Sequence, residues 1–153
     1  DDARMGVFGY SRGGMAASLL TLKLGSEIKA AVFGAGIYDF KRAYEETGFD
    51  DIRQNMQNES GMTGKAIRER SSILQMQKLK SPILILHGEN DLNAPTNQSL
   101  LLRDRLTELK KDFEIRILAN HKHGVFKTEF IMLVIDFFNR KLKGISPEIR
   151  LSD

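Results

Sequence analysis

Residues 9–14, Gly-Tyr-Ser-Arg-Gly-Gly, constrain the fold of this chain more than any other segment. An apolar run precedes them and a helical pattern follows, so Ser11 stands where a strand turns into a helix. Glycines leave room in so tight a turn for a serine with a strained backbone and an exposed hydroxyl. A pattern of glycine, serine and glycine at three fixed positions occurs by chance in about one chain in twenty of this length. The interpretation of Ser11 as a nucleophile therefore depends on the rest of the chain.

The remainder of the sequence alternates apolar strand-like runs with helical patterns. The expected strands are residues 4–8, 29–33, 82–87 and 113–118, and the expected helices are 14–24, 97–109 and 127–142. This alternation predicts right-handed crossovers between parallel strands. The sequence therefore indicates the α/β class, with about four parallel strands and flanking helices.

A long polar insertion, at about residues 38–80, separates the second and third expected strands. Residues 67–79 have a helical pattern, while residues 55–64 are rich in Gly, Asn and Gln. We expect a helical, lid-like insertion here. Its methionines, Met56, Met62 and Met76, either line a substrate pocket or fill irregular gaps in the core. Beyond Gly144 the periodicity ends, and we expect a surface extension.

The composition excludes several classes of function. With 153 residues and 41% hydrophobic content, one globular unit is expected. The net charge is +3 without a Lys/Arg block, so neither nucleic-acid binding nor a polybasic membrane segment is indicated. No apolar run is long enough to span a bilayer. The absence of cysteine excludes disulfides, thiolate catalysis and cysteine-bound zinc, and the compartment stays undetermined.

A nucleophilic serine needs a base, and the base needs an orienting carboxylate. Asp91 follows the third expected strand, and His123 follows the fourth. The carboxyl ends of parallel strands share one edge of the sheet, so Ser11, Asp91 and His123 can meet there. Taken singly, they could be a helix cap, a turn former and a solvated histidine. Their order at successive strand ends favours a Ser-His-Asp triad.

Other residues compete for these roles. His121 could replace His123 as the base, or the two could form a metal site, but no third ligand cluster accompanies them. We therefore predict neither a metal nor an organic cofactor. Asp39 follows the second expected strand and is an alternative acid. His87 ends the third strand, where we expect a structural role.

Arg12 has two separate expected roles. Its backbone amide, at the start of a helix, would stabilise the oxyanion of the tetrahedral intermediate. Its side chain would form a salt bridge within the scaffold or, alternatively, bind an anionic group of the substrate.

These segments together resemble the C-terminal part of the catalytic domain of the prolyl oligopeptidase family of serine peptidases. The resemblance rests on residues 9–14, on residues 68–72 leading to 81–91, and on His123 followed by Gly124. It implies an α/β-hydrolase fold, with residues 1–153 as a partial catalytic domain. It also implies Ser11 as nucleophile, Asp91 as acid and His123 rather than His121 as base.

The chain departs from the family pattern in places. Arg12 stands where the family often has an aromatic residue, and Ala94-Pro95 replaces the more usual Val-Pro. A complete domain of this family has further strands before the nucleophile strand, and that part supplies the second oxyanion donor. We therefore expect an unpaired apolar edge at the first strand, to be covered by a missing N-terminal portion of the same enzyme or by a second copy.

The expected function is a serine hydrolase that cleaves peptide or ester bonds of small substrates through an acyl-enzyme. The alternatives are a carboxylesterase-like hydrolase and a non-catalytic hydrolase-like module that binds a partner.

Overall fold

The computed structural model describes residues 2–124 and 128–145 and contains one parallel sheet. Its strands lie side by side in chain order: β1 (Gly6–Tyr10), β2 (Ala30–Gly34), β3 (Ile83–Gly88) and β4 (Phe113–Leu118). Parallel pairing brings the carboxyl ends of all four strands to the same edge of the sheet. The loops that follow the strands therefore meet at that edge.

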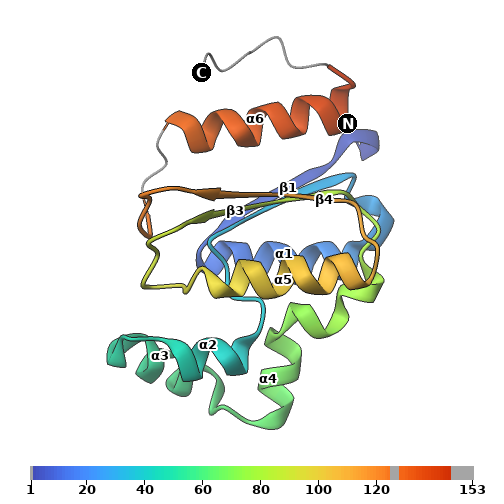
Figure 1. The fold of residues 1–153 in the computed structure, drawn as a ribbon. Coiled ribbons are helices and arrows are strands. Elements are labelled where there is room, and N and C mark those ends of the chain that lie inside the picture. The colour runs from blue at the N-terminus through green and yellow to red at the C-terminus, as the bar shows by residue number, and fades with distance from the viewer. Residues whose placement is uncertain (1, 125–127, 146–153) are drawn as a thin grey trace.

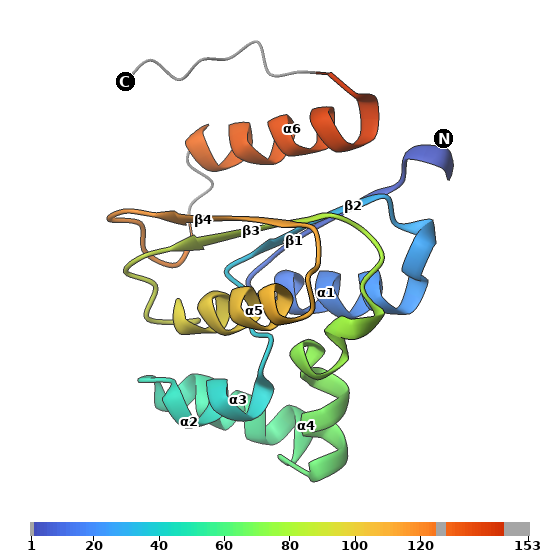
Figure 2. The same ribbon diagram turned by 45° about the vertical axis from the view of Figure 1, so that its right-hand side comes forward.

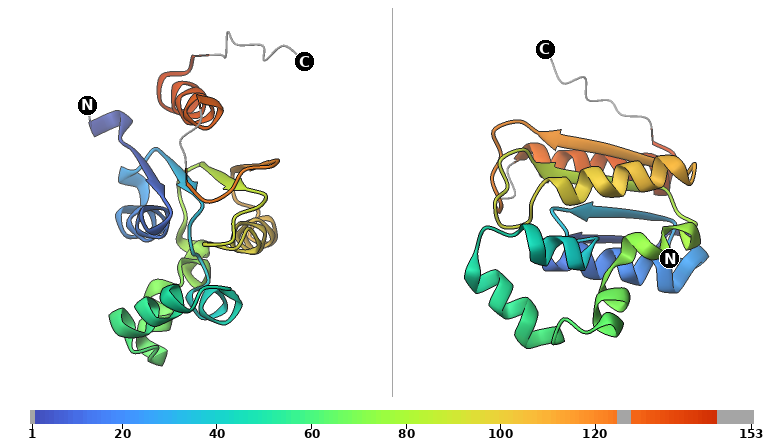
Figure 3. Two further views of the ribbon diagram at one scale, coloured as in Figure 1. Left: turned by 90° about the vertical axis from the view of Figure 1, so that its left-hand side faces the viewer. Right: turned by 60° about the horizontal axis from the view of Figure 1, so that its bottom comes forward.

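Helices cover both faces of this sheet (Figures 1 and 2). One face packs against α6 (Thr128–Lys143), and the other packs against α1 (Arg12–Leu24) and α5 (Asn97–Glu108). Beyond α1 and α5 lies a further layer (Figure 3) that consists of α2 (Phe40–Glu46), α3 (Asp50–Ser60) and α4 (Gly64–Arg70). A 3₁₀ segment, Ser72–Lys78, leads from this layer back to β3. None of the described helices combines the length and the low polarity needed to cross a bilayer.

The central strands are buried on both faces, which explains their uninterrupted apolar sequences. In β3, Ile83 and Ile85 pack into the core beside α1 and α5, whereas Leu84 and Leu86 pack into the core beside α6. Because successive side chains of a strand point to opposite faces, a single strand contributes to both cores. These two cores fix the sheet on which the site is built.

The fold agrees with the predicted class, and its elements differ in detail. The first strand begins at Gly6 rather than at residue 4, because residues 2–4 form a 3₁₀ turn, and it extends to Tyr10, which pairs with Gly34. The helix predicted over residues 97–109 ends at Glu108. The last helix runs to Lys143, while its expected first residue, 127, lies outside the described residues. The extension expected beyond Gly144 also lies outside them from residue 146 onward.

The insertion is more helical than its composition suggested. Residues 55–60, which the sequence indicated only as a polar stretch, belong to α3. The single helix expected over residues 67–79 is instead divided into α4 and the 3₁₀ segment. The division has a physical cause: Ser71 Oγ accepts a hydrogen bond from the Phe40 amide, and Ser72 Oγ hydrogen-bonds to Ser18 Oγ. These tertiary contacts outweigh the helical pattern.

An apolar edge of the sheet is exposed at β1, which has one neighbour among the described strands. A groove between β1 and α1 is lined mostly by apolar side chains, including Val7, Phe8, Leu19 and Leu20. Phe8 and Leu20 are each 42% exposed. This is the edge that the sequence predicted.

Candidate active site

Ser11 occupies a strained turn between β1 and α1. Its backbone angles are φ 55° and ψ −121°, and residues other than glycine rarely adopt a positive φ of this kind. The Ser11 amide donates to the Gly34 carbonyl at 2.8 Å, and the Ser11 carbonyl accepts from the amides of Gly14 and Met15. Neighbouring elements thus hold the conformation that costs about 1–3 kcal/mol.

Two of the glycines around Ser11 are required by close backbone contacts. A Cβ at Gly9 would lie 2.0 Å from the Gly13 carbonyl oxygen, and a Cβ at Gly14 would lie 2.6 Å from the Gly34 carbonyl oxygen. Gly13 is different, because a Cβ there would have no neighbour within 4 Å among the residues that the structure describes. The steric requirement expected for every glycine of this turn is therefore wrong at Gly13.

Three polar side chains, from the segments that follow β1, β3 and β4, meet at the carboxyl edge of the sheet. The imidazole Nε2 of His123, in the loop after β4, lies 2.9 Å from Ser11 Oγ. Its Nδ1 lies 2.7 Å from Oδ2 of Asp91, in the loop after β3. The tautomer with a proton on Nδ1 satisfies both contacts, since His123 then donates to Asp91 and accepts from the serine hydroxyl. This tautomer leaves Nε2 free to receive the serine proton.

Asp91 is held by several donors, and its side chain is completely buried. Its Oδ1 accepts hydrogen bonds from the amides of Asn93 and Ala94, each at 3.0 Å. Burial alone would raise the pKa of Asp91, but hydrogen bonds from His123, His87 and the Ala94 amide outweigh it and hold the pKa below its usual value. The carboxylate is therefore charged and oriented toward His123.

His87 contacts this carboxylate, which the sequence did not indicate. Its Nε2 lies 2.8 Å from the Ala94 carbonyl oxygen and 3.2 Å from Asp91 Oδ2, and its Nδ1 lies 2.7 Å from Ser99 Oγ. Because Nε2 faces two acceptors, it carries the proton. The spacing of four residues between His87 and Asp91, across a tight turn, was the available signal.

Tyr10 was also missed as part of the site. Its hydroxyl accepts a hydrogen bond of 2.9 Å from the Gly124 amide, next to His123, and its ring centroid lies 5.6 Å from that of His123. Burial raises the pKa of the Tyr10 phenol. The residue before the nucleophile therefore supports the loop that carries the imidazole.

The competing candidates lie in other environments. His121 Nδ1 lies 2.9 Å from the Ala119 carbonyl oxygen, and its Nε2 lies 3.8 Å from a Glu129 carboxylate oxygen. Asp39 caps α2 by accepting a hydrogen bond from the Arg42 amide at 3.1 Å. Neither side chain contacts Ser11 in these interactions. Within residues 2–124 and 128–145, no cluster of three or more potential ligands could hold a metal ion.

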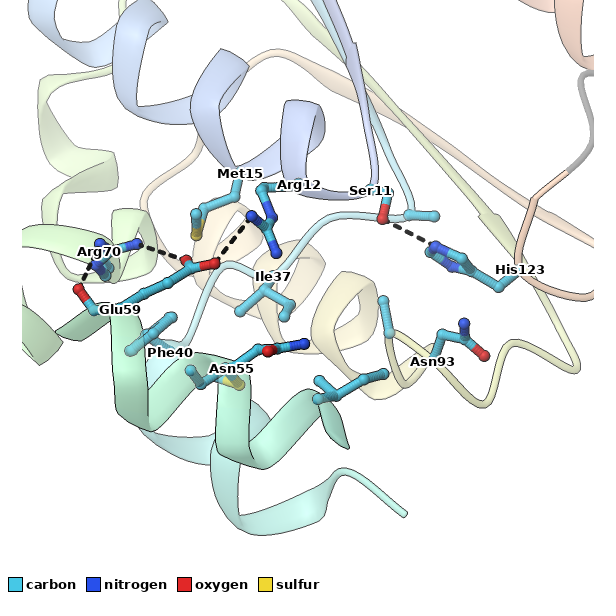
Figure 4. A pocket seen from close by; sticks show the side chains of 14 residues that line it. Ser11, Arg12, Met15, Ile37, Phe40, Asn55, Glu59, Arg70, Asn93 and His123 are labelled. Carbon is cyan, nitrogen blue, oxygen red and sulfur yellow. Dashed lines mark hydrogen bonds and ion pairs between the residues drawn. The ribbon is translucent and has the colours of Figure 1, made fainter. Parts of the chain in front are cut away.

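A cavity of about 180 Å³ opens beside Ser11 and His123 (Figure 4). Its apolar wall combines residues before and within the inserted helices: Met15, Ile37, Phe40, Ile52 and Met56. Of the three methionines considered in the sequence, Met56 lines this cavity. Met76 is instead fully buried in the core, and Met62 packs against the cluster around Phe40.

Arg12 is the first residue of α1. At this position its amide has no intrahelical acceptor, as at every helix start. Its side chain extends along the cavity wall to Glu59, and Nη1 of Arg12 lies 2.9 Å from Oε1 of Glu59. The scaffold salt bridge, one of the two roles expected for this side chain, is thus present.

Comparisons with known proteins agree with this fold. A sequence model of the prolyl oligopeptidase family matches residues 1–144. An uncharacterized peptidase of Bacillus subtilis, YtmA, is 32% identical over 124 residues, which are 78% of this chain and 48% of that protein. The chain thus spans about half the length of this relative.

Solved structures of longer peptidases superpose on almost the whole chain. A puromycin-hydrolyzing peptidase of Mycobacterium tuberculosis has a TM-score of 0.84 and 25% identity, covering 97% of this chain and 23% of that one. An acylaminoacyl peptidase of Pyrococcus horikoshii, at 23% identity and a TM-score of 0.82, covers 98% of this chain and 26% of that one. The latter likeness supports the α/β-hydrolase fold alone. By the extent of the family match, the chain belongs to the prolyl oligopeptidase family.

Proposed function

We propose that this chain forms the catalytic part of a serine peptidase, in which Ser11, His123 and Asp91 act as a triad on small peptide or ester substrates. One observation carries the proposal: the hydrogen-bonded series from Asp91 through His123 ends on the hydroxyl of a serine in a strained turn, beside a cavity. Family membership supports a hydrolytic role for this arrangement.

The proposed mechanism follows from these contacts. Ser11 Oγ attacks the substrate carbonyl as its proton passes to His123 Nε2, and Asp91 stabilises the resulting imidazolium. The Arg12 amide donates to the oxyanion, aided by the N-terminal end of α1. His123 then returns the proton to the leaving amine or alcohol, which departs and leaves an acyl-Ser11. Water, activated by His123, hydrolyses this ester and restores the serine.

The inserted helices would act as a lid over the acyl side of the substrate. Support for this role comes from the apolar side chains of Phe40, Ile52 and Met56, which belong to α2 and α3 and face the cavity. We favour peptide bonds over esters as the substrate, because the similar proteins of Bacillus subtilis and Mycobacterium tuberculosis are described as peptidases. A second oxyanion donor is expected from another portion of the same enzyme.

Replacement of the nucleophile tests the proposal. Ser11→Ala is expected to abolish turnover of an aminoacyl p-nitroanilide and of a p-nitrophenyl ester, by about 10⁴-fold or more, without changing the circular dichroism spectrum. Ser26→Ala, which removes an exposed hydroxyl elsewhere, serves as the matched control. Turnover that survives in the Ser11 variant would contradict the assignment. Inactivity of the wild type and of every variant, measured with the portion that supplies the second oxyanion donor present, would favour the binding module.

A further inference from the structure

The cavity beside Ser11 has an imbalance of charge. Among the described residues that line it, Arg12 and Arg70 contribute two guanidinium groups, whereas Glu59 contributes the one carboxylate. The remaining wall is mostly apolar or uncharged, apart from the His123 imidazole. A cavity with this lining attracts a negatively charged group more than a positively charged one.

Arg12 lies where it could reach a substrate. It follows Ser11 directly, and its side chain extends along the cavity toward Glu59 (Figure 4). The guanidinium has five donors, and the side chain is 72% exposed despite the ion pair. An ion pair this exposed contributes little to stability, so a substrate carboxylate can replace Glu59 as the partner of Arg12 at little cost.

Arg70 is held more firmly on the opposite side of Glu59. Its guanidinium lies over the Phe40 ring, 5.4 Å from the centroid, and its Nη2 donates to the Glu59 carbonyl oxygen at 3.4 Å. The Nη1 is 3.9 Å from the Glu59 carboxylate, at the limit of an ion pair. Arg70 is therefore a fixed positive charge, while Glu59 is shared between two cations.

We infer that this cavity selects substrates with an acidic side chain on the residue that donates the scissile carbonyl. The substrate carboxylate would bind Arg12, near Arg70, and Glu59 would be the internal competitor that it displaces. The aliphatic part of the same side chain would contact Met15 and Ile37 on the apolar wall. This inference rests on the proposed function, because it places the substrate carbonyl at Ser11.

Two isosteric substrates test the inference. We compare kcat/KM for peptidyl p-nitroanilides that have Glu or Gln before the scissile bond. The wild-type protein is expected to prefer the Glu substrate by roughly three- to tenfold, since the two substrates differ by one charge-assisted contact with the cavity. Arg12→Gln and Arg70→Gln should reduce this ratio toward one, and Glu59→Gln should increase it. Arg68→Gln, two residues before Arg70 and outside the cavity, is the matched control.

Two further measurements test the inference without relying on the activity of the arginine or glutamate variants. The wild-type Glu/Gln ratio should fall as NaCl is raised, because salt screens the pairing. Calorimetry on the Ser11→Ala protein should show tighter binding of N-acetyl-glutamate amide than of N-acetyl-glutamine amide. A wild-type ratio at or below one, a ratio unchanged by Arg12→Gln, or equal binding of the two amides would overturn the inference. Loss of turnover on both substrates, with selective binding intact, would instead contradict the proposed function alone.

Discussion

At the scale of single residues, Asp91 receives more hydrogen bonds than are needed to orient one imidazole. His123 and His87 both approach its Oδ2, and two backbone amides approach its Oδ1. His87 also binds the Ala94 carbonyl, so it ties the acid to the loop in which the acid lies. We therefore regard His87 as a positioning residue that acts through Asp91.

Replacing His87 should affect the chemical step more than substrate binding. His87→Leu removes one donor from Asp91 and leaves the Ala94 carbonyl and the Ser99 hydroxyl without their imidazole partner. We expect kcat to fall about tenfold, the equivalent of one hydrogen bond of ~1.4 kcal/mol, with little change in KM. His87→Gln keeps a donor and should recover part of the loss. A folded His87→Leu protein with wild-type kcat would rule out the positioning role.

At the scale of elements, the turn from β1 to α1 depends on one close approach between neighbouring segments. Gly14 lies against the Gly34 carbonyl at the end of β2, whereas no atom of the described residues lies within 4 Å of a Cβ at the adjacent Gly13. This contact lets α1 begin close to the sheet, with Ser11 at the exposed edge. The two glycines therefore have different structural roles, although they are adjacent and both belong to α1.

Alanine at these two positions should have opposite effects on stability. Gly14→Ala forces a backbone shift and should lower the free energy of unfolding by about 1–3 kcal/mol. Gly13→Ala should raise it by up to about 1 kcal/mol, because alanine favours helix over glycine. Urea unfolding followed by circular dichroism measures both. Equal losses at the two positions would show that α1 does not pack as described.

The strands of the sheet, and the residues that follow their carboxyl ends, could be predicted from the sequence. Asp91 and His123 could be found because the carboxyl ends of parallel strands share one edge, a property that requires no side-chain geometry. The Arg12–Glu59–Arg70 cluster could not be found this way, since it depends on where α3 lies relative to α1. The contact between His87 and Asp91 depends likewise on how the loop after β3 closes.

At the scale of the whole molecule, the buried Asp91 links stability to pH. Its pKa is lowered in the folded state relative to the usual 3.8. The folded state therefore binds fewer protons, so the contribution of Asp91 is complete above about pH 4–5 and is lost as the pH falls further. Asp91→Asn removes this titration. The free energy of unfolding should consequently depend less steeply on pH below about 4 in the variant, and identical slopes would contradict the assigned environment of Asp91.

In the proposed mechanism, Ser11 is a nucleophile that His123 activates. The most direct measurement is to treat the protein with a fluorophosphonate and locate the covalent adduct by tandem mass spectrometry. The adduct is predicted on Ser11, at a rate that His123→Ala greatly reduces. An adduct on any other serine, or labelling of Ser11 at the same rate without His123, would contradict this role of Ser11 and His123.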